Sequence, residues 1–163
     1  MPKIPTEEQL TFHYAVYSKV CEIPYGQTTS YGHIAKLIHY PRNPRQVGMS
    51  LKHMDYYLQF LNDEDDRALF DPSSIPWWRV INSEGGISKR ETPEAVRRQV
   101  ERLRQEGVEV ETQDWTRQSS APSSWTPYHV NFQSYGWFPH VQGEDDEDES
   151  SDSVTVKQED EGL

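Results

Sequence analysis

The 163-residue chain has a formal net charge of −11, and 34% of its residues are hydrophobic and 12% aromatic. This length fits one domain followed by a tail. The low hydrophobic content indicates that part of the chain does not fold, while the aromatic residues suit a packed core elsewhere. The single cysteine, Cys21, excludes an internal disulfide and a cysteine-based zinc site. With no apolar leader and no stretch long enough to span a bilayer, we expect a soluble intracellular protein.

The negative charge is concentrated in two segments. Residues 143–163 hold ten acidic residues and one lysine, and residues 54–75 hold six acidic residues and one arginine. Residues 1–53 instead hold six basic and three acidic residues, and residues 76–142 are neutral overall. Because duplex DNA is a dense line of phosphates, only the N-terminal third is expected to attract it.

The first expected helix spans residues 7–21, with Thr6 as its N-cap and two acidic residues in its first turn. Four residues at helical spacing form its expected apolar stripe: Leu10, Tyr14, Tyr17 and Cys21. This stripe makes Cys21 a buried core cysteine, as free cysteines commonly are.

Two shorter helices are expected over residues 30–39 and from Pro44 to Lys52, joined by a turn at 40–43. Ser30 can cap the first, whose inner face is expected to hold Tyr31, Ile34, Ala35 and Ile38. Two short helices joined by a tight turn form the outline of a helix-turn-helix. An ordinary helical hairpin has the same outline, and the pattern alone does not decide between them.

The next segment, residues 55–75, looks like an insertion, and its acidic run at 62–66 is expected to be a solvated loop. The insertion could lengthen one wall of a pocket or be only a surface loop. An apolar segment over residues 75–81 is expected to be partly a strand, and a turn is expected at 83–86.

The last expected helix begins at Thr92, a cap followed by proline, and ends at Gly107. Its inner face is expected to hold Val96, Val100 and Leu103, and Val108 and Val110 suggest a short edge segment. We further expect a loop at 116–125, an apolar segment at 135–139 that docks back on the domain, and disorder from residue 142 onward.

Several short motifs resemble the DNA-binding domain of O6-alkylguanine-DNA alkyltransferases. They are residues 23–32 (Ile-Pro-Tyr-Gly-Gln-Thr-Thr-Ser-Tyr-Gly), 45–48 (Arg-Gln-Val-Gly, similar to Arg-x-Val-Gly of the recognition helix) and 76–81 (Pro-Trp-Trp-Arg-Val-Ile, similar to the Pro-Cys-His-Arg-Val signature). Residues 87–90 and 135–139 are more similar to the alkyltransferase-like branch, which replaces the signature cysteine. The resemblance covers residues 7–139, with interruptions at 55–75 and 113–130.

The resemblance implies a mainly α, winged helix-turn-helix-like DNA-binding domain with a short β element over residues 7–139. The composition of the remaining residues, 140–163, predicts a disordered acidic tail. It implies that Arg45 fills the gap left by a flipped base and that Tyr31 crowds the target phosphate. The full set of implied DNA-binding residues is Tyr31, Arg45, Gln46, Gly48, Ser50 and Lys52. Without the resemblance, Arg45 is a phosphate contact or surface charge, Tyr31 a core aromatic, and the small residues serve helix packing.

The resemblance also implies a pocket for alkylated guanine made by Trp77, Trp78, Arg79 and Arg90. In the alkyltransferase-like branch the residue matching Arg90 lies over the flipped base, although in a charged run it could equally be a surface charge. The Trp77 ring offers stacking to a purine, and Trp78 either lines the pocket or packs beneath it.

Transfer of an alkyl group from guanine requires a thiolate. Trp77 stands where the signature cysteine would be, and Trp78 where active relatives carry the histidine that relays the proton. Glu106 matches the glutamate that orients this histidine, so it is expected to have lost its partner and to be a surface carboxylate or a relic of the pocket. We therefore expect no enzyme activity, no catalytic residue, no cofactor and no metal.

The resulting hypothesis is a monomeric nuclear protein that binds O6-alkylguanine in double-stranded DNA by base flipping, does not transfer the alkyl group, and flags the lesion for nucleotide excision repair proteins. No membrane partner is expected. The alternatives are an active transferase that uses Cys21 or another nucleophile, a helix-turn-helix regulator that reads base sequence, and a structural interaction module.

The acidic tail contains two modification patterns. Residues 156–159 fit a SUMO-attachment pattern at Lys157, and Ser150, Ser151 and Ser153 lie among acidic residues, as acidophilic kinase sites do. The tail could instead raise solubility and weaken non-specific DNA binding by occupying the basic surface.

Overall fold

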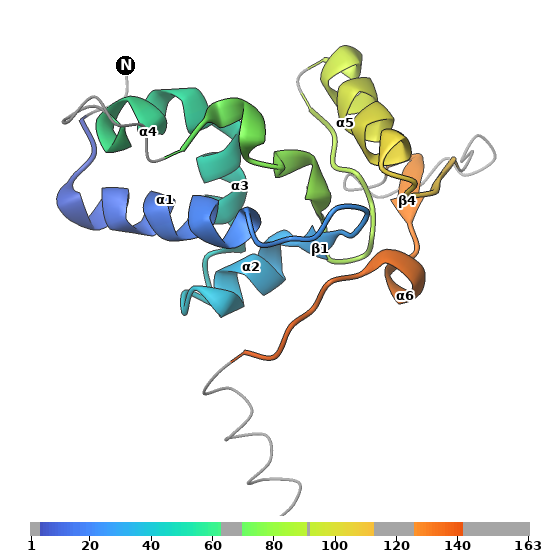
Figure 1. The fold of residues 1–163 in the computed structure, drawn as a ribbon, viewed down its shortest axis with the longest axis horizontal. Helices are drawn as coiled ribbons and strands as arrows, with labels where there is room; N and C mark the ends of the chain where they lie inside the picture. The colour runs from blue at the N-terminus through green and yellow to red at the C-terminus, as the bar shows by residue number, and fades with distance from the viewer. Residues whose placement is uncertain (1–3, 63–69, 91, 113–125, 142–163) are drawn as a thin grey trace, which may run out of the picture.

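A computed structural model describes residues 4–62, 70–90, 92–112 and 126–141. The elements within these ranges are α1 (Glu7–Val20), β1 (Thr29–Ser30), α2 (Tyr31–Leu37), α3 (Pro44–Lys52), α4 (Met54–Leu61), the 3-10 turns η1 (Pro72–Ser74) and η2 (Trp77–Arg79), β2 (Val80–Ile81), α5 (Pro93–Gln105), β3 (Val110–Thr112), β4 (Tyr128–Val130) and α6 (Phe132–Tyr135). Helices α1 to α4 lie together on one side, α5 and β4 lie on the other, and β1 lies between them (Figure 1). Within the described ranges, no helix combines the length and apolar character needed to cross a bilayer.

Helix α1 begins as expected but buries a different face. The Thr6 hydroxyl accepts from the Gln9 backbone, and the Gln9 side chain accepts from the Thr6 backbone, which completes a capping box. Of the expected stripe only Tyr17 is fully buried, since Leu10 is half-buried and Tyr14 is 46% exposed. The prediction of a buried Cys21 is wrong, because this residue is the exposed C-cap of the helix.

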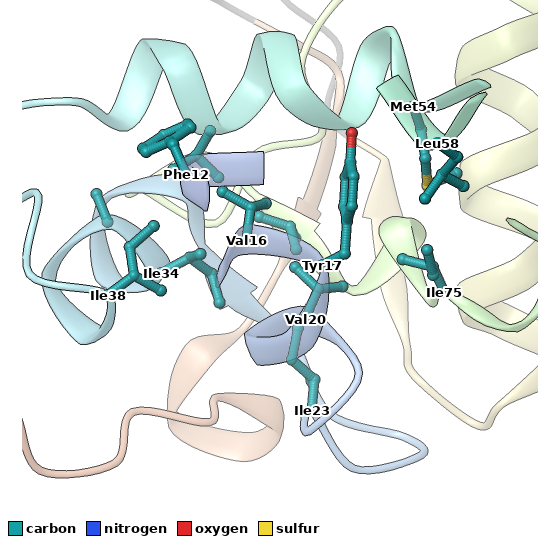
Figure 2. Close-up of a cluster of buried hydrophobic side chains, with 13 residues drawn as sticks. Phe12, Val16, Tyr17, Val20, Ile23, Ile34, Ile38, Met54, Leu58 and Ile75 are labelled. Carbon is teal, nitrogen blue, oxygen red and sulfur yellow. The ribbon is translucent and has the colours of Figure 1, made fainter. Parts of the chain in front are cut away.

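The buried face of α1 is rotated relative to the expected stripe. It consists of Phe12, His13, Val16, Tyr17 and Val20, and Figure 2 shows the apolar members of this set beside residues of α2 and α4. Helix α1 carries apolar residues around much of its circumference. The face that carries Val16 and Val20 packs inward. Which face of α1 is buried depends on the partner helices and not on the spacing of apolar residues in α1 alone.

The helix-turn-helix is confirmed in α2 and α3. The Ser30 hydroxyl accepts from the His33 backbone and caps α2, whose Ile34 and Ala35 are fully buried. Helix α3 has Pro44 in its first turn and buries Val47. Between the helices, His39 reverses the chain with a positive φ of 69°, a conformation that histidine tolerates better than bulky or β-branched residues do.

The first part of the expected insertion is a helix that belongs to the core. Helix α4 buries Met54 and Leu58 against the cluster formed by α1 to α3. After the helix, the Asn62 side-chain amide donates to the Phe70 carbonyl and accepts from the Phe70 amide. Residues 54–61 therefore pack rather than loop out, because their apolar side chains cover α1. The acidic residues 63–66 lie outside the described ranges.

The second half of the domain is built on α5 and two short strand pairs. Thr92 caps α5, and Gly107 ends it with φ +88° while Val108 donates back to Leu103, which is a Schellman motif. Strands β1 and β2 pair in parallel, and β3 and β4 pair antiparallel. These elements confirm a mainly helical domain with a short β element.

The C-terminal segment docks on the domain as expected. The Thr28 amide donates to the Tyr135 carbonyl, and the Trp137 amide donates to the Thr28 carbonyl, each at 2.7 Å. A ring nitrogen of His33 lies 2.8 Å from the Pro139 carbonyl. The expected loop at 116–125 and the tail beyond residue 141 lie outside the described ranges.

Two apolar clusters make up the core, and Trp77 touches both. The first joins α1 to α4 with Ile75 and Val80, and the second joins α5, β3 and β4 with Trp78 and Ile81. Trp77 is half-buried and packs against both clusters. Trp77 therefore lies at the junction between the two halves of the domain.

A buried histidine of α1, His13, contacts α3. The His13 side chain lies 2.8 Å from the Ser50 hydroxyl, and its ring stacks on Tyr57 with centroids 3.6 Å apart. The Tyr17 hydroxyl donates to the Ser50 carbonyl at 2.7 Å. Burial lowers the pKa of His13 from 6.5 to about 4, so this imidazole remains neutral in the folded chain well below neutral pH.

This lowered pKa predicts acid destabilisation. Between about pH 6.5 and about pH 4 the unfolded chain binds a proton at His13 that the folded chain does not. The free energy of unfolding should therefore fall by up to about 3 kcal/mol as the pH falls through this window. Urea unfolding at a series of pH values measures it, and His13→Gln should lose this part of the slope. Identical pH profiles for the two chains would contradict the assignment.

Candidate nucleic-acid interface

The exposed side of α3 faces two adjoining hollows. The outer basin, of about 630 Å³, lies between α3, residues 88–90 and the start of α5. The inner cavity, of about 310 Å³, leads from it toward Trp77. Six residues line both hollows: Tyr31, Gly48, Lys52, Arg90, Ala95 and Arg98. The two hollows thus form one continuous depression.

The outer basin is strongly cationic. Five basic residues and no carboxylate are among the described residues that line it, namely Arg45, Lys52, Lys89, Arg90 and Arg98. The basin therefore concentrates positive charge on a protein of net charge −11. Such a surface attracts a phosphate backbone even when the whole chain is acidic.

The inner cavity is smaller than the basin and has Trp77 on its wall. The guanidinium carbon of Arg90 lies 5.2 Å from the centroid of the Trp77 ring, within the range of a cation–π contact. Leu51 and Met54 supply apolar surface, and Asp55, at the start of α4, supplies its one carboxylate among the described lining residues. Of the residues in the expected insertion that the structure describes, Asp55 lines this cavity.

Tyr31 lies at the boundary between the basin and the cavity. Burial raises the pKa of its phenol, an effect that the nearby Arg90 guanidinium and Ser88 hydroxyl only partly offset. Tyr31 therefore remains a neutral hydrogen-bond donor at physiological pH. A Cβ added at Gly48 would lie 3.7 Å from the Tyr31 ring, so glycine at this position leaves the ring open to a ligand that approaches α3.

The helical period explains which expected DNA-binding residues of α3 come together. Arg45, Gly48 and Lys52 share the face toward the basin, since they are three and four positions apart. Gln46 instead lines a separate groove of about 640 Å³ on another side of α3. Ser50 is fully buried and bonded to His13, so its expected role in DNA contact is wrong: its position faces the core.

Trp78 and Arg79 lie behind the cavity and are not among the residues that line it. Trp78 is 7% exposed and belongs to the second core cluster, so it packs beneath the pocket. Its indole nitrogen donates to the Glu106 carboxylate at 2.7 Å. Arg79 donates to the same carboxylate from Nε and Nη2. Its Nη1 donates to the Ile23 carbonyl at 2.7 Å. Both residues support the wall that carries Trp77.

Glu106 is the hydrogen-bond acceptor at the centre of this support. Of the two roles expected for it, the surface carboxylate is wrong, and it is not without hydrogen-bond partners. Its side chain is only 7% exposed, and it accepts from Trp78, from Arg79 and from the Gly26 amide. Burial alone would raise its pKa, but the hydrogen bonds from Arg79, Gly26 and Trp78 outweigh burial and hold the pKa below its usual value. Sequence reasoning missed this because the donors, Gly26, Trp78 and Arg79, lie far from Glu106 in the sequence.

Arg98 and Asp55 line the site but were not expected there. Arg98 follows Ala95 by three positions, so both lie on one face of α5 and line the cavity together. This helical spacing is the one feature of the sequence that could have predicted the position of Arg98. Cys21 does not line either hollow, and desolvation raises the pKa of its thiol, the opposite of what a reactive thiolate requires. No cluster of potential metal ligands occurs within the ranges that the structure describes.

The Glu106 contacts predict a large effect of removing its charge. Glu106→Gln leaves the Arg79 guanidinium, whose side chain is 12% exposed, without a counter-charge and should lower the free energy of unfolding by about 3–5 kcal/mol. Trp78→Phe, the matched control, removes one donor and leaves the ion pair, so it should cost less. Urea unfolding at pH 7 compares them, and a Glu106→Gln chain as stable as the wild type would contradict the role of Glu106.

Comparison with known proteins gives a consistent set of relatives. The family model for the 6-O-methylguanine DNA methyltransferase DNA-binding domain matches residues 11–108. Alkyltransferase-like protein 1 of Schizosaccharomyces pombe is 38% identical over 128 residues, which is 78% of this chain and 95% of that protein. The DNA base-flipping protein of Escherichia coli K12 is 37% identical over 112 residues, which is 66% of this chain and 74% of that protein.

A solved structure also matches. The crystal structure of the S. pombe alkyltransferase-like protein in complex with damaged DNA containing O6-carboxymethylguanine aligns with a TM-score of 0.59 and 36% identity, over 83% of this chain and all of that chain. The helix-turn-helix formed by α2 and α3 lies within the residues that the family model matches. The chain belongs to the family of the 6-O-methylguanine DNA methyltransferase DNA-binding domain.

Proposed function

We propose that this chain binds O6-alkylguanine in duplex DNA, holds the flipped base in the inner cavity against Trp77, and leaves the alkyl group in place. One observation carries the proposal. A carboxylate-free cationic basin on α3 opens directly into a smaller cavity that has the Trp77 indole on its wall. The basin suits the DNA backbone, and the cavity suits an unstacked base.

The energetics of flipping assign roles to the residues at the boundary. Extruding a base costs a few kcal/mol of unstacking, and stacking a base on an aromatic ring recovers roughly 1–3 kcal/mol. Trp77 supplies that ring. Arg45, exposed at the start of α3, enters the gap that the base leaves. Tyr31, at the mouth of the cavity, crowds the phosphate of the flipped nucleotide.

The same site lacks the groups for alkyl transfer. Transfer requires a thiolate at the cavity wall and a base that relays a proton to it. Trp77 offers no nucleophile, and the Trp78 indole N–H is donated to Glu106. Cys21, the one cysteine of the chain, does not line the cavity. These features favour a binder over an enzyme and argue against the alternative of a transferase acting through Cys21.

The relatives support this function. They include a protein named for base flipping and one solved in complex with damaged DNA that contains O6-carboxymethylguanine. A protein that binds such a lesion without reversing it serves as a flag, here as a monomer in the nucleus that presents the lesion to nucleotide excision repair. The binding unit is residues 7–139, with the acidic tail outside it.

A titration of the full chain with matched duplexes tests the function. A duplex with one O6-methylguanine should bind more tightly than the same duplex with guanine. Arg45→Ala should weaken lesion binding about tenfold or more, because the gap in the duplex is no longer filled. Arg97→Ala, an exposed arginine of α5 outside both hollows, is the matched control and should bind almost as the wild type does.

Two results would contradict the proposal. An affinity that follows base sequence and ignores the lesion would support a helix-turn-helix regulator. An Arg45→Ala chain with an unchanged dissociation constant for the lesion duplex would contradict the proposed role of Arg45 in filling the gap left by the flipped base.

A second prediction concerns chemistry at the signature position. Trp77→Cys should not restore efficient alkyl transfer, because Trp78 cannot relay a proton. The double variant Trp77→Cys/Trp78→His should transfer faster than the single variant, since the introduced imidazole could accept that proton while bonded to Glu106. Intact-protein mass spectrometry after incubation with the methylated duplex measures transfer, and rapid stoichiometric gain of a methyl group by the single variant would refute the explanation.

A further inference from the structure

Gln99 is a polar side chain inside the core, in the middle of α5. It is 1% exposed, and both ends of its amide are used. Its oxygen accepts from Nη2 of Arg90 at 3.0 Å, and its nitrogen donates to the carbonyls of Trp78 and Val80 at 3.1 and 3.2 Å. From these contacts we infer that Gln99 is the positioning residue that holds Arg90 over Trp77 for lesion recognition, an inference that rests on the proposed function.

The backbone next to Trp77 sets the direction of the Gln99 amide. Its nitrogen faces two carbonyls, so a flipped amide would place its oxygen against both and its nitrogen against a guanidinium. The observed orientation is therefore strongly preferred. The carbonyls of Trp78 and Val80, in the segment that carries Trp77, therefore fix the position of the Gln99 oxygen that accepts from Arg90.

Arg90 needs such support because of where it lies. It belongs to the connection between β2 and α5 and not to a helix or strand, and sites on connecting segments are held less accurately than sites on regular elements. The hydrogen bond to Gln99 and the cation–π contact with Trp77, at 5.2 Å, restrain the guanidinium from two directions. Its remaining N–H groups stay available to a base.

A fixed guanidinium should matter more for the lesion than for plain DNA. Ordering a long side chain on binding costs free energy, and a chain that is already ordered avoids part of this cost. Without Gln99 as acceptor, the charge of Arg90 stays in the basin and still attracts phosphates. What is lost is the placement of the guanidinium beside the flipped base. The ratio of affinities for lesion and plain duplex should therefore fall, while affinity for plain duplex stays close to that of the wild type.

A double-mutant cycle on the full chain tests this. The probes are a duplex with one O6-methylguanine and its guanine counterpart, and the chains are wild type, Gln99→Met, Arg90→Ala and the double variant. Gln99→Met should reduce the affinity ratio about tenfold, the scale of one hydrogen bond to a charged group. It should cause no further loss in the Arg90→Ala background, because Gln99 acts through Arg90. Gln105→Met, an exposed position of the same helix, is the matched control and should keep the wild-type ratio.

Each outcome decides a different question. A wild-type chain that binds both duplexes equally overturns the proposed function and the inference with it. A discriminating wild type with an unchanged ratio in Gln99→Met overturns the inference alone, as does an equal loss in the Arg90→Ala background, which would mean a purely structural role. If Gln99→Met does not fold, Arg90→Lys keeps the charge but not the planar fork. It should lose discrimination as Arg90→Ala does, and retention of the wild-type ratio would overturn the inference.

Discussion

The buried carboxylate of Glu106 joins the segments on which the site depends. It accepts from the Gly26 amide in the turn before the helix-turn-helix, and from Trp78 and Arg79 in the turn that carries Trp77. Since Glu106 is itself the C-cap of α5, one side chain ties together both halves of the domain. The position of Trp77 between α3 and α5 follows from this connection. Breaking it would alter the geometry of the cavity without touching a residue that lines it.

The pair Trp77 and Trp78 separates recognition from chemistry. In the proposed function, the indole of Trp77 is an aromatic surface on the cavity wall that offers no nucleophile. The Trp78 indole donates its N–H to Glu106. This arrangement supplies a hydrogen bond to the scaffold without the basic nitrogen that alkyl transfer needs. In the proposed function, the site is therefore retained for binding while both chemical groups are gone.

Most of the fold and part of the site follow from the sequence, for reasons that differ between residues. Ser30, Thr92 and Gly107 act through their own neighbours in the chain, so their capping roles were predictable. The grouping of Arg45, Gly48 and Lys52 follows from the helical period. Cys21 was misplaced because a rotation of α1 by part of a turn decides which face is buried, and only the partner helices set that rotation. Ser50 lies two positions from Gly48, so the same helical period places it on the opposite, buried face of α3.

Glu106 and Gln99 could not be predicted because their partners lie far away in sequence or are backbone carbonyls. Helix α4 was hidden by the acidic residues that follow it, although its own apolar residues pack in the core.

A crystal structure of the full chain bound to a duplex with O6-methylguanine tests the central claim most directly. We expect the modified guanine to be out of the base stack, with its ring and methyl group against Trp77, Arg45 in the gap and the methyl group still on the base. A modified guanine that remains stacked in the duplex, or one held in the groove beside Gln46, would contradict the assignment of the cavity.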